Sequence, residues 1–299
     1  MTEPRTVFIT QALFATFLWS ASKIIMKLGL GIVPPLLLVG CIQAVAFISL
    51  LIYIRWRPPR LDRPFRPSEI YALVLLGVMG FVVAPLFSVI GLKYVAGTTA
   101  GLFAGISSIL VMFLSWMMLK EYPKMWQLLG GIVAGVGAYV FLLDGKFSGT
   151  NFGIMMIILS ELAYAFNIVL TRFVMRRPGD DALLVALVGS GLGAVILLPL
   201  GLLGGSWVGL GSWQIWLIII TLGLIFAFAG LWWNYALNYL RSFEASVLQN
   251  TMIIQVGLLS WIFLKELITW ENLLGAIIVL AGAYLVNREL LNGYVARGD

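Results

Sequence analysis

The sequence contains no histidine and only one cysteine, and both shortages restrict its chemistry. Without histidine there can be no His-ligated metal site and no Ser–His catalytic triad. With Cys41 alone, no intrachain disulfide can form. Charged residues are also scarce, at 11% of 299 residues against 61% hydrophobic residues. A water-soluble fold could not bury that much apolar surface, so the composition predicts an all-α integral membrane protein.

Ten apolar segments are long enough, or nearly long enough, to cross a bilayer as helices of about 20 residues. They are residues 7–29, 35–54, 69–92, 97–119, 126–144, 151–174, 182–203, 213–238, 243–264 and 270–287. The N-terminus runs directly into the first segment without a small-residue cleavage signal. We therefore expect a retained first span and not a signal peptide.

A long internal repeat divides the chain into two halves. Residues 114–139 and 259–284 match at 13 of 26 positions without a gap, at an offset of 145 residues. Each copy contains Leu-Lys-Glu followed by Gly-x6-Gly-Ala-Tyr. The sequence thus predicts one repeat in residues 1–146 and a second in 147–299. Because each half holds five spans, an odd number, the second would be inverted in the membrane, as in many transporters.

The basic residues are distributed unequally between the two sides of the predicted membrane. With the N-terminus inside, 14 of the 19 basic residues fall on the cytoplasmic side. This imbalance predicts a multi-pass protein of the bacterial inner membrane with both termini in the cytoplasm. The Arg-rich stretch 55–67 could bind nucleic acid or anionic lipid, but a topology-setting loop is the favoured interpretation, and we expect no nucleic-acid partner.

Two polar stripes occupy equivalent places in the two halves. Ser160, Tyr164 and Asn167 recur at helical spacing on the sixth predicted span, and the offset pairs Tyr164 and Asn167 with Trp19 and Ser22 on the first. Polar side chains are costly in lipid and mark function by default. The stripes therefore predict a substrate cavity between the halves. The alternative is that they join helices through hydrogen bonds.

Further candidates lie on the sixth, eighth and ninth predicted spans. Glu161 stands near the bilayer centre, where a carboxylate could couple proton movement, attract an ammonium group or serve as a structural partner. Trp233 and Asn234 belong to an aromatic-rich span that could stack on a planar substrate or simply face lipid. Gln249 and Asn250 add polar groups to the ninth span, and they share no face with Gln255, so at most one of these groups would line a cavity.

Other residues predict structure more than substrate contact. The offset aligns Pro85 with Gly230, which suggests paired hinges in the third and eighth spans. Lys120-Glu121 lies at a span end, which favours helix termination and an interfacial ion pair over catalysis. Three glycine pairs have the small-xxx-small spacing that lets helices approach closely. They are Gly101/Gly105, Gly131/Gly135 and Gly189/Gly193.

The sequence LWSASKIIMKLGL at 18–30, together with the two Leu-Lys-Glu and Gly-x6-Gly blocks, resembles the drug/metabolite transporter superfamily of EamA type. The resemblance covers nearly the whole chain, and among members it is most similar to the YddG-type aromatic amino acid exporters. It implies ten helices around a central cavity shared by both halves, and export of small metabolites. Members often carry a proline midway along the fourth and ninth spans, and this chain has none there.

These observations predict a secondary transporter, not an enzyme, that exports small amphipathic metabolites by alternating access. Amino acids with aromatic or large apolar side chains are the expected substrates, and lipid is the expected surrounding. No cofactor or metal is expected. No Gly-Lys-Ser/Thr phosphate loop is present, which argues against an ATP-driven pump. The alternatives are a carrier of drug-like cations or nucleotide sugars, an integral-membrane enzyme and a passive pore.

Overall fold

The computed structural model describes residues 5–30, 32–58, 66–92, 94–95, 109–141, 150–175, 182–204, 209–264 and 269–295. Every regular element among these residues is a helix, which confirms the all-α prediction. The elements are α1 (Arg5–Leu30), α2 (Pro35–Trp56), α3 (Pro67–Val78), the π-helix η1 (Met79–Val83), α4 (Ala84–Leu92), the π-helix η2 (Ser115–Leu119), α6 (Met125–Phe141), α7 (Asn151–Met175), α8 (Ala182–Leu203), α9 (Trp213–Leu237), α10 (Ser242–Gln249), α11 (Thr251–Leu264) and α12 (Trp270–Val295).

Seven helical stretches of the described chain are long and apolar enough to cross a membrane. They are Thr6–Met26, Pro35–Trp56, Pro67–Gly91, Asn151–Met175, Ala182–Leu203, Trp213–Leu237 and Ser242–Phe263. Three shorter apolar helices are Ile109–Leu119, Met125–Phe141 and Trp270–Val286. Each predicted span overlaps one of these helices, and the count of ten spans stays a prediction.

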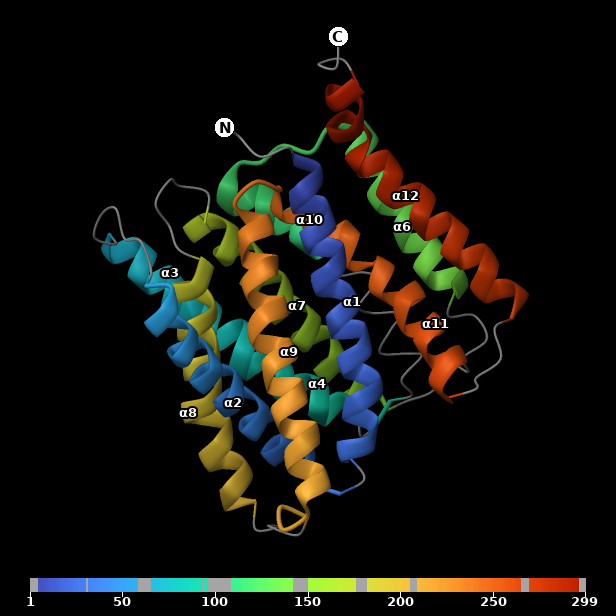
Figure 1. The fold of residues 1–299 in the computed structure, drawn as a ribbon. Helices are drawn as coiled ribbons and strands as arrows, with labels where there is room; N and C mark the ends of the chain where they lie inside the picture. Colours follow the sequence, from blue (N-terminus) through green and yellow to red (C-terminus); the bar gives the residue numbers. More distant parts are fainter. Residues whose placement is uncertain are drawn as a thin grey trace.

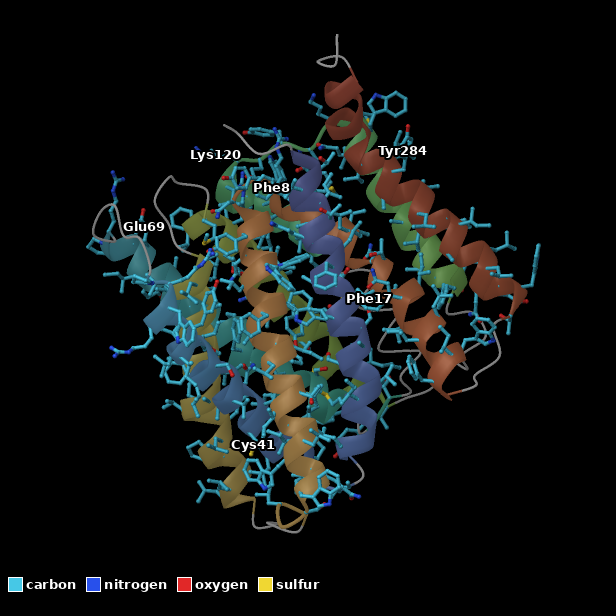
Figure 2. The ribbon with its side chains drawn as sticks, in the orientation of Figure 1. Phe8, Phe17, Cys41, Glu69, Lys120 and Tyr284 are labelled. Atoms are coloured by element: carbon cyan, nitrogen blue, oxygen red, sulfur yellow. The ribbon has the colours of Figure 1, made fainter. Side chains whose placement is uncertain are left out.

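The helices form a bundle in which neighbours come from distant parts of the chain (Figure 1). Helix α1 packs along α9, α4 along α7, α2 along α8, and α6 along α12. The start of α1 and the end of α12 lie at the same end of the bundle, which we call the terminal face (Figure 1). Figure 2 places Phe8 and Lys120 at this face and Cys41 toward the opposite end.

Helices α6 and α12 touch through the repeated glycines. A Cβ atom built on Gly137 would lie 2.4 Å from the backbone nitrogen of Val279, and one on Gly282 would lie 2.4 Å from the backbone nitrogen of Ala134. Real Cβ atoms do not approach backbone so closely, so no other residue fits without separating the helices. The two Gly-x6-Gly blocks of the repeat therefore serve to bring the fifth and tenth predicted spans together.

The predicted glycine pairs behave differently from one another. Cβ atoms on Gly131 and Gly135 would meet no described atom within 4 Å, so no described helix packs closely against this pair. A Cβ on Gly189 would lie 2.4 Å from the ring of Phe81, and one on Gly193 would lie 3.1 Å from the carbonyl of Phe81. Close packing at that pair is confirmed. The third pair, at positions 101 and 105, lies outside the described residues.

The third span is irregular at the predicted hinge. The π-helical turn η1 ends two residues before Pro85, and the N–H of Ala84 donates to the carbonyl of Met79, one residue further back than in an α-helix. Proline has no N–H, so the carbonyl four residues before it loses its usual donor. The wider turn is one way the chain accommodates that loss. Gly230, its counterpart under the offset, lies within the uninterrupted helix α9, where an added Cβ would meet nothing within 4 Å.

The ninth span is also interrupted, although it has no proline. Helix α10 ends at Gln249 and α11 starts at Thr251, with Asn250 between them. The N–H of Asn250 donates to the carbonyl of Val247 at 3.1 Å, a tighter turn than an α-helix makes. Asn250 keeps α-helical dihedral angles, φ −60° and ψ −22°, so the interruption is one tightened turn and not an unwound segment.

Candidate functional site

Two of the predicted site residues meet across the halves. The rings of Trp19 on α1 and Trp233 on α9 lie 5.4 Å apart between centroids, tilted by 54°. This distance is within the range of favourable aromatic pairs. Trp233 is buried and Trp19 is half-buried, and both belong to the apolar cluster between α1, α7 and α9. The two tryptophans therefore form one aromatic wall.

A polar network joins α1 to α11 next to this wall. The hydroxyl of Ser20 donates to Oε1 of Gln255 at 3.0 Å, and Nε2 of Gln255 donates to the hydroxyl oxygens of Thr16 at 3.2 Å and Thr251 at 3.4 Å. Both polar ends of the Gln255 side chain are thus satisfied by protein. We interpret this residue as a tie between the first and ninth spans.

Two residues that adjoin the network in sequence have buried polar atoms with no described partner. Trp19 precedes Ser20, and its indole Nε1 is buried with no hydrogen-bond partner among the described residues. Asn250 precedes Thr251, is only 4% exposed, and its Nδ2 is likewise without a described partner. Both atoms are donors, and a buried donor without an acceptor costs about 1–3 kcal/mol. A bound molecule with acceptor oxygens could remove that cost.

The polar stripe on α7 contacts the irregular third span. Nδ2 of Asn167 donates to the carbonyl of Leu76 at 2.9 Å, and the hydroxyl of Ser160 donates to the carbonyl of Ala84 at 2.9 Å. These carbonyls flank η1, in the stretch where Pro85 and the π-helical turn alter the backbone bonding. Both side chains therefore tie α7 to the third span.

The remaining candidates have the following positions. The hydroxyl of Ser22 donates to the carbonyl of Trp19 on its own helix, and Nδ2 of Asn234 donates to the carbonyl of Ala182 at the start of α8. Tyr164 and Gln249 are half-buried. Glu161 is also half-buried on α7, one turn before Tyr164. Among the described residues, no group of three His, Cys, Asp or Glu side chains could hold a metal ion.

Sequence reasoning missed the connecting role of Gln255 and the polar contacts of the terminal face. The sequence placed Gln255 on a different face from Gln249 and Asn250, but gave no means to see that Thr16 and Ser20 lie opposite it. The expected ion pair at the Lys120-Glu121 span end is confirmed, because Oε1 of Glu121 lies 3.3 Å from Nε of Arg172. Its partner could not be read from the chain, because Arg172 is 51 residues away.

An all-helical bundle with several apolar helices of bilayer length is the fold of an integral membrane protein. Polar side chains between those helices place it in the class of membrane transporters. The sequence profile of the EamA-like transporter family matches this chain twice, over residues 7–143 and 151–288. The chain belongs to the EamA-like transporter family. It is a multi-pass membrane transporter, consistent with its apolar helices.

Individual relatives agree with this family. An uncharacterized transporter of Archaeoglobus fulgidus is 26% identical over 289 residues, which cover 94% of this chain and 99% of the relative. A second uncharacterized transporter of the same archaeon is 27% identical over 154 residues, so that alignment spans about half of each chain, 52% and 54%. A protein crystal structure superposes with a TM-score of 0.77 at 17% identity, covering 96% of this chain and 98% of the other, and supports the fold alone.

Proposed function

We propose that this transporter exports small amphipathic metabolites, with amino acids that carry aromatic or large apolar side chains as the main substrate class. The observation that carries the proposal is the aromatic wall of Trp19 and Trp233, together with two buried donors that have no described partner, Nε1 of Trp19 and Nδ2 of Asn250. A planar side chain would stack on the wall, and a carboxylate would accept from the donors. The similarity to YddG-type exporters seen in the sequence supports the same substrate class.

We further propose that transport uses alternating access between two inverted five-helix repeats. Three observations support this arrangement. The family profile matches once in each half, and the halves share a 145-residue offset. Under that offset, the pairing of α1 with α9 corresponds to the pairing of α7 with α4. The offset also aligns α2 with α8 and α6 with α12, so each of these two pairings joins a helix to its own counterpart in the other half. Such contacts are those expected around a twofold axis that relates the repeats.

Other polar residues have secondary roles in the proposed transport. Ser160, Asn167 and Ser22 would line the cavity edge while satisfying helix carbonyls, and Tyr164 lies on the same stripe. Glu161 is the candidate for ion coupling because its carboxylate lies within a membrane span. A nucleotide sugar would require several deep basic residues, and the spans supply few. A drug-like cation is the second candidate, since aromatic walls also attract cations.

A counterflow assay tests the substrate class. We expect proteoliposomes loaded with unlabelled phenylalanine or tryptophan to accumulate the labelled amino acid from outside, with saturation, while arginine and aspartate give none. Saturation and counterflow distinguish a carrier from a pore, because a pore cannot exchange one molecule for another against its gradient. Counterflow with organic cations but with no amino acid would overturn the proposal in favour of the second candidate. Flux without saturation would overturn carrier transport itself.

Membrane orientation has its own test. We propose a location in the bacterial inner membrane with both termini cytoplasmic, on the charge imbalance described above. An alkaline phosphatase fusion after residue 146 is expected to be active, which shows a periplasmic position, and a fusion after residue 178 is expected to be inactive. A green fluorescent protein fused at the same two points should show the opposite pattern. Equal localisation of the two points would contradict the inverted arrangement.

A further inference from the structure

We propose that Arg172 is a lock that holds the terminal face closed in this structure, and that it must release for substrate to enter from that face. The inference rests on the transporter class of the protein and not on the identity of the substrate. It concerns a residue outside the predicted substrate site, which the sequence presented only as one more topology-setting charge.

The first part of the lock is a contact between two helices. Nη1 of Arg172, in the last turn of α7, donates to the carbonyls of Leu237 at 2.6 Å and Asn238 at 2.7 Å. These carbonyls are at the C-terminal end of α9. The last carbonyls of a helix have no donors within the helix and carry its partial negative charge. The guanidinium of one helix therefore caps the end of another, which holds α7 and α9 together at this face.

The second part is the ion pair with the end of the fourth predicted span. Nε of Arg172 lies 3.3 Å from Oε1 of Glu121, and each side chain is only 14% exposed. Lys120, with a φ of 54°, ends η2 in the left-handed region and turns the chain so that Glu121 follows directly. One arginine thus contacts three segments that are far apart in sequence: α7, the end of η2 and the end of α9.

Two further contacts join helices at the terminal face. The ring of Phe8, on α1, stacks on that of Tyr239, just beyond α9, with centroids 3.6 Å apart and an angle of 13°. Nε2 of Gln127, at the start of α6, donates to Oε1 of the buried Glu244, at the start of α10. Beneath these contacts lies an apolar cluster that includes Ala165, which is fully buried. These contacts join α1, α6 and α10 to the segments that Arg172 connects at the terminal face.

The contacts are of a kind that can release. Oε2 of Glu121 is buried with no hydrogen-bond partner among the described residues, so the ion pair is not fully satisfied. Burying two charges costs desolvation free energy, and an ion pair with one unpartnered oxygen offsets only part of that free energy. When the face opens, water would solvate both charges and the helix carbonyls. This solvation lowers the free-energy difference between the closed and open states. The offset pairs Arg172 with Lys27 and Glu121 with Glu266, so the sequence repeats these charges at residues whose side chains lie outside the described part.

Cysteine accessibility tests the lock without substrate. The reporter is Ala165→Cys in a Cys41→Ala background, because Ala165 is seven residues before Arg172 on the same face of α7, about 10 Å deeper. With purified protein in lipid nanodiscs, we expect Arg172→Ala to raise the rate of reaction with a small charged thiol reagent at least tenfold. Arg172→Lys should give a smaller rise in the reaction rate. The lysine ammonium group keeps the charge, but it lacks the planar guanidinium that contacts the helix carbonyls and the carboxylate at the same time.

Two controls separate opening from general loosening. Arg55→Ala removes an exposed charge at the end of α2 and should leave the rate unchanged. A second reporter, Ala46→Cys, is buried in a different cluster on α2 and should stay unreactive when Arg172 is replaced. An unchanged rate at Ala165→Cys would overturn the lock, as would an equal rise at both reporters, which would show loss of packing only. Failure of amino acid counterflow would leave this result unaffected, since the assay contains no substrate.

Discussion

Replacing Gly137 with alanine is expected to lower the thermal midpoint of the protein, although it adds a single methyl group. That methyl would lie 2.4 Å from the backbone nitrogen of Val279, so α6 and α12 would have to separate. Overpacking of this kind costs about 2–3 kcal/mol, or a midpoint lower by roughly 5–10 °C. Fluorescence-detected size-exclusion chromatography after heating in detergent measures the change.

The matched control is Gly135→Ala, two residues away on the same helix. Its methyl would meet no atom of the described part of the chain within 4 Å, and alanine is favoured over glycine in a helix by about 0.5–1 kcal/mol. We expect an equal or slightly higher midpoint. A similar decrease in both variants would show that α6 tolerates no substitution, and would remove the distinction between the two glycine faces.

Replacing Trp19 with phenylalanine is expected to reduce substrate affinity at least tenfold. Phenylalanine keeps an aromatic ring against Trp233 but lacks the indole Nε1, which is buried without a described protein acceptor. A hydrogen bond to a charged acceptor contributes about 1.5–3 kcal/mol, which corresponds to a factor of ten or more. The half-saturation concentration in counterflow gives the measurement.

Trp232→Phe is the control for the loss of an indole on the neighbouring residue. The ring of Trp232 contacts Phe14, 5.0 Å away between centroids, and Phe14 is 48% exposed on the outer surface. We expect the half-saturation concentration to change less than twofold. If Trp19→Phe also left it unchanged, the free indole nitrogen would have no part in binding and the carboxylate role assigned to it would be wrong.

The glycine pairs show how far spacing alone can predict packing. The pairs Gly131/Gly135 and Gly189/Gly193 have the same spacing, yet among the described residues the second pair alone has a close neighbour. Spacing places two residues on one face of a helix, but it does not say which way that face points. Within the repeat blocks, sequence comparison found the paired glycines, and the structure then showed that the second glycine of each block packs against the other block.

The predicted polar site residues likewise show what the sequence can predict and what needs the structure. Sequence reasoning placed Ser160 and Asn167 on one stripe, and in the structure both side chains donate to backbone carbonyls of the third span. Their acceptors could not be predicted, because those carbonyls flank the π-helical turn before Pro85 and a proline does not by itself specify such a turn. Arg172 was assigned to the cytoplasmic charges, and its contacts with the end of α9 required knowledge of where that helix ends.

Composition, hydropathy and the internal repeat are enough to identify a helical membrane protein with two similar halves. Long apolar segments can satisfy their backbone groups in lipid only as helices or closed barrels, and their lengths here match helical spans. Only the tertiary structure decided which faces of those helices meet, which polar atoms find partners, and that Arg172 joins three segments at the terminal face. The physical reason is that hydropathy depends on each segment alone, whereas the rotation and neighbours of a helix depend on the shape of every surface packed around it.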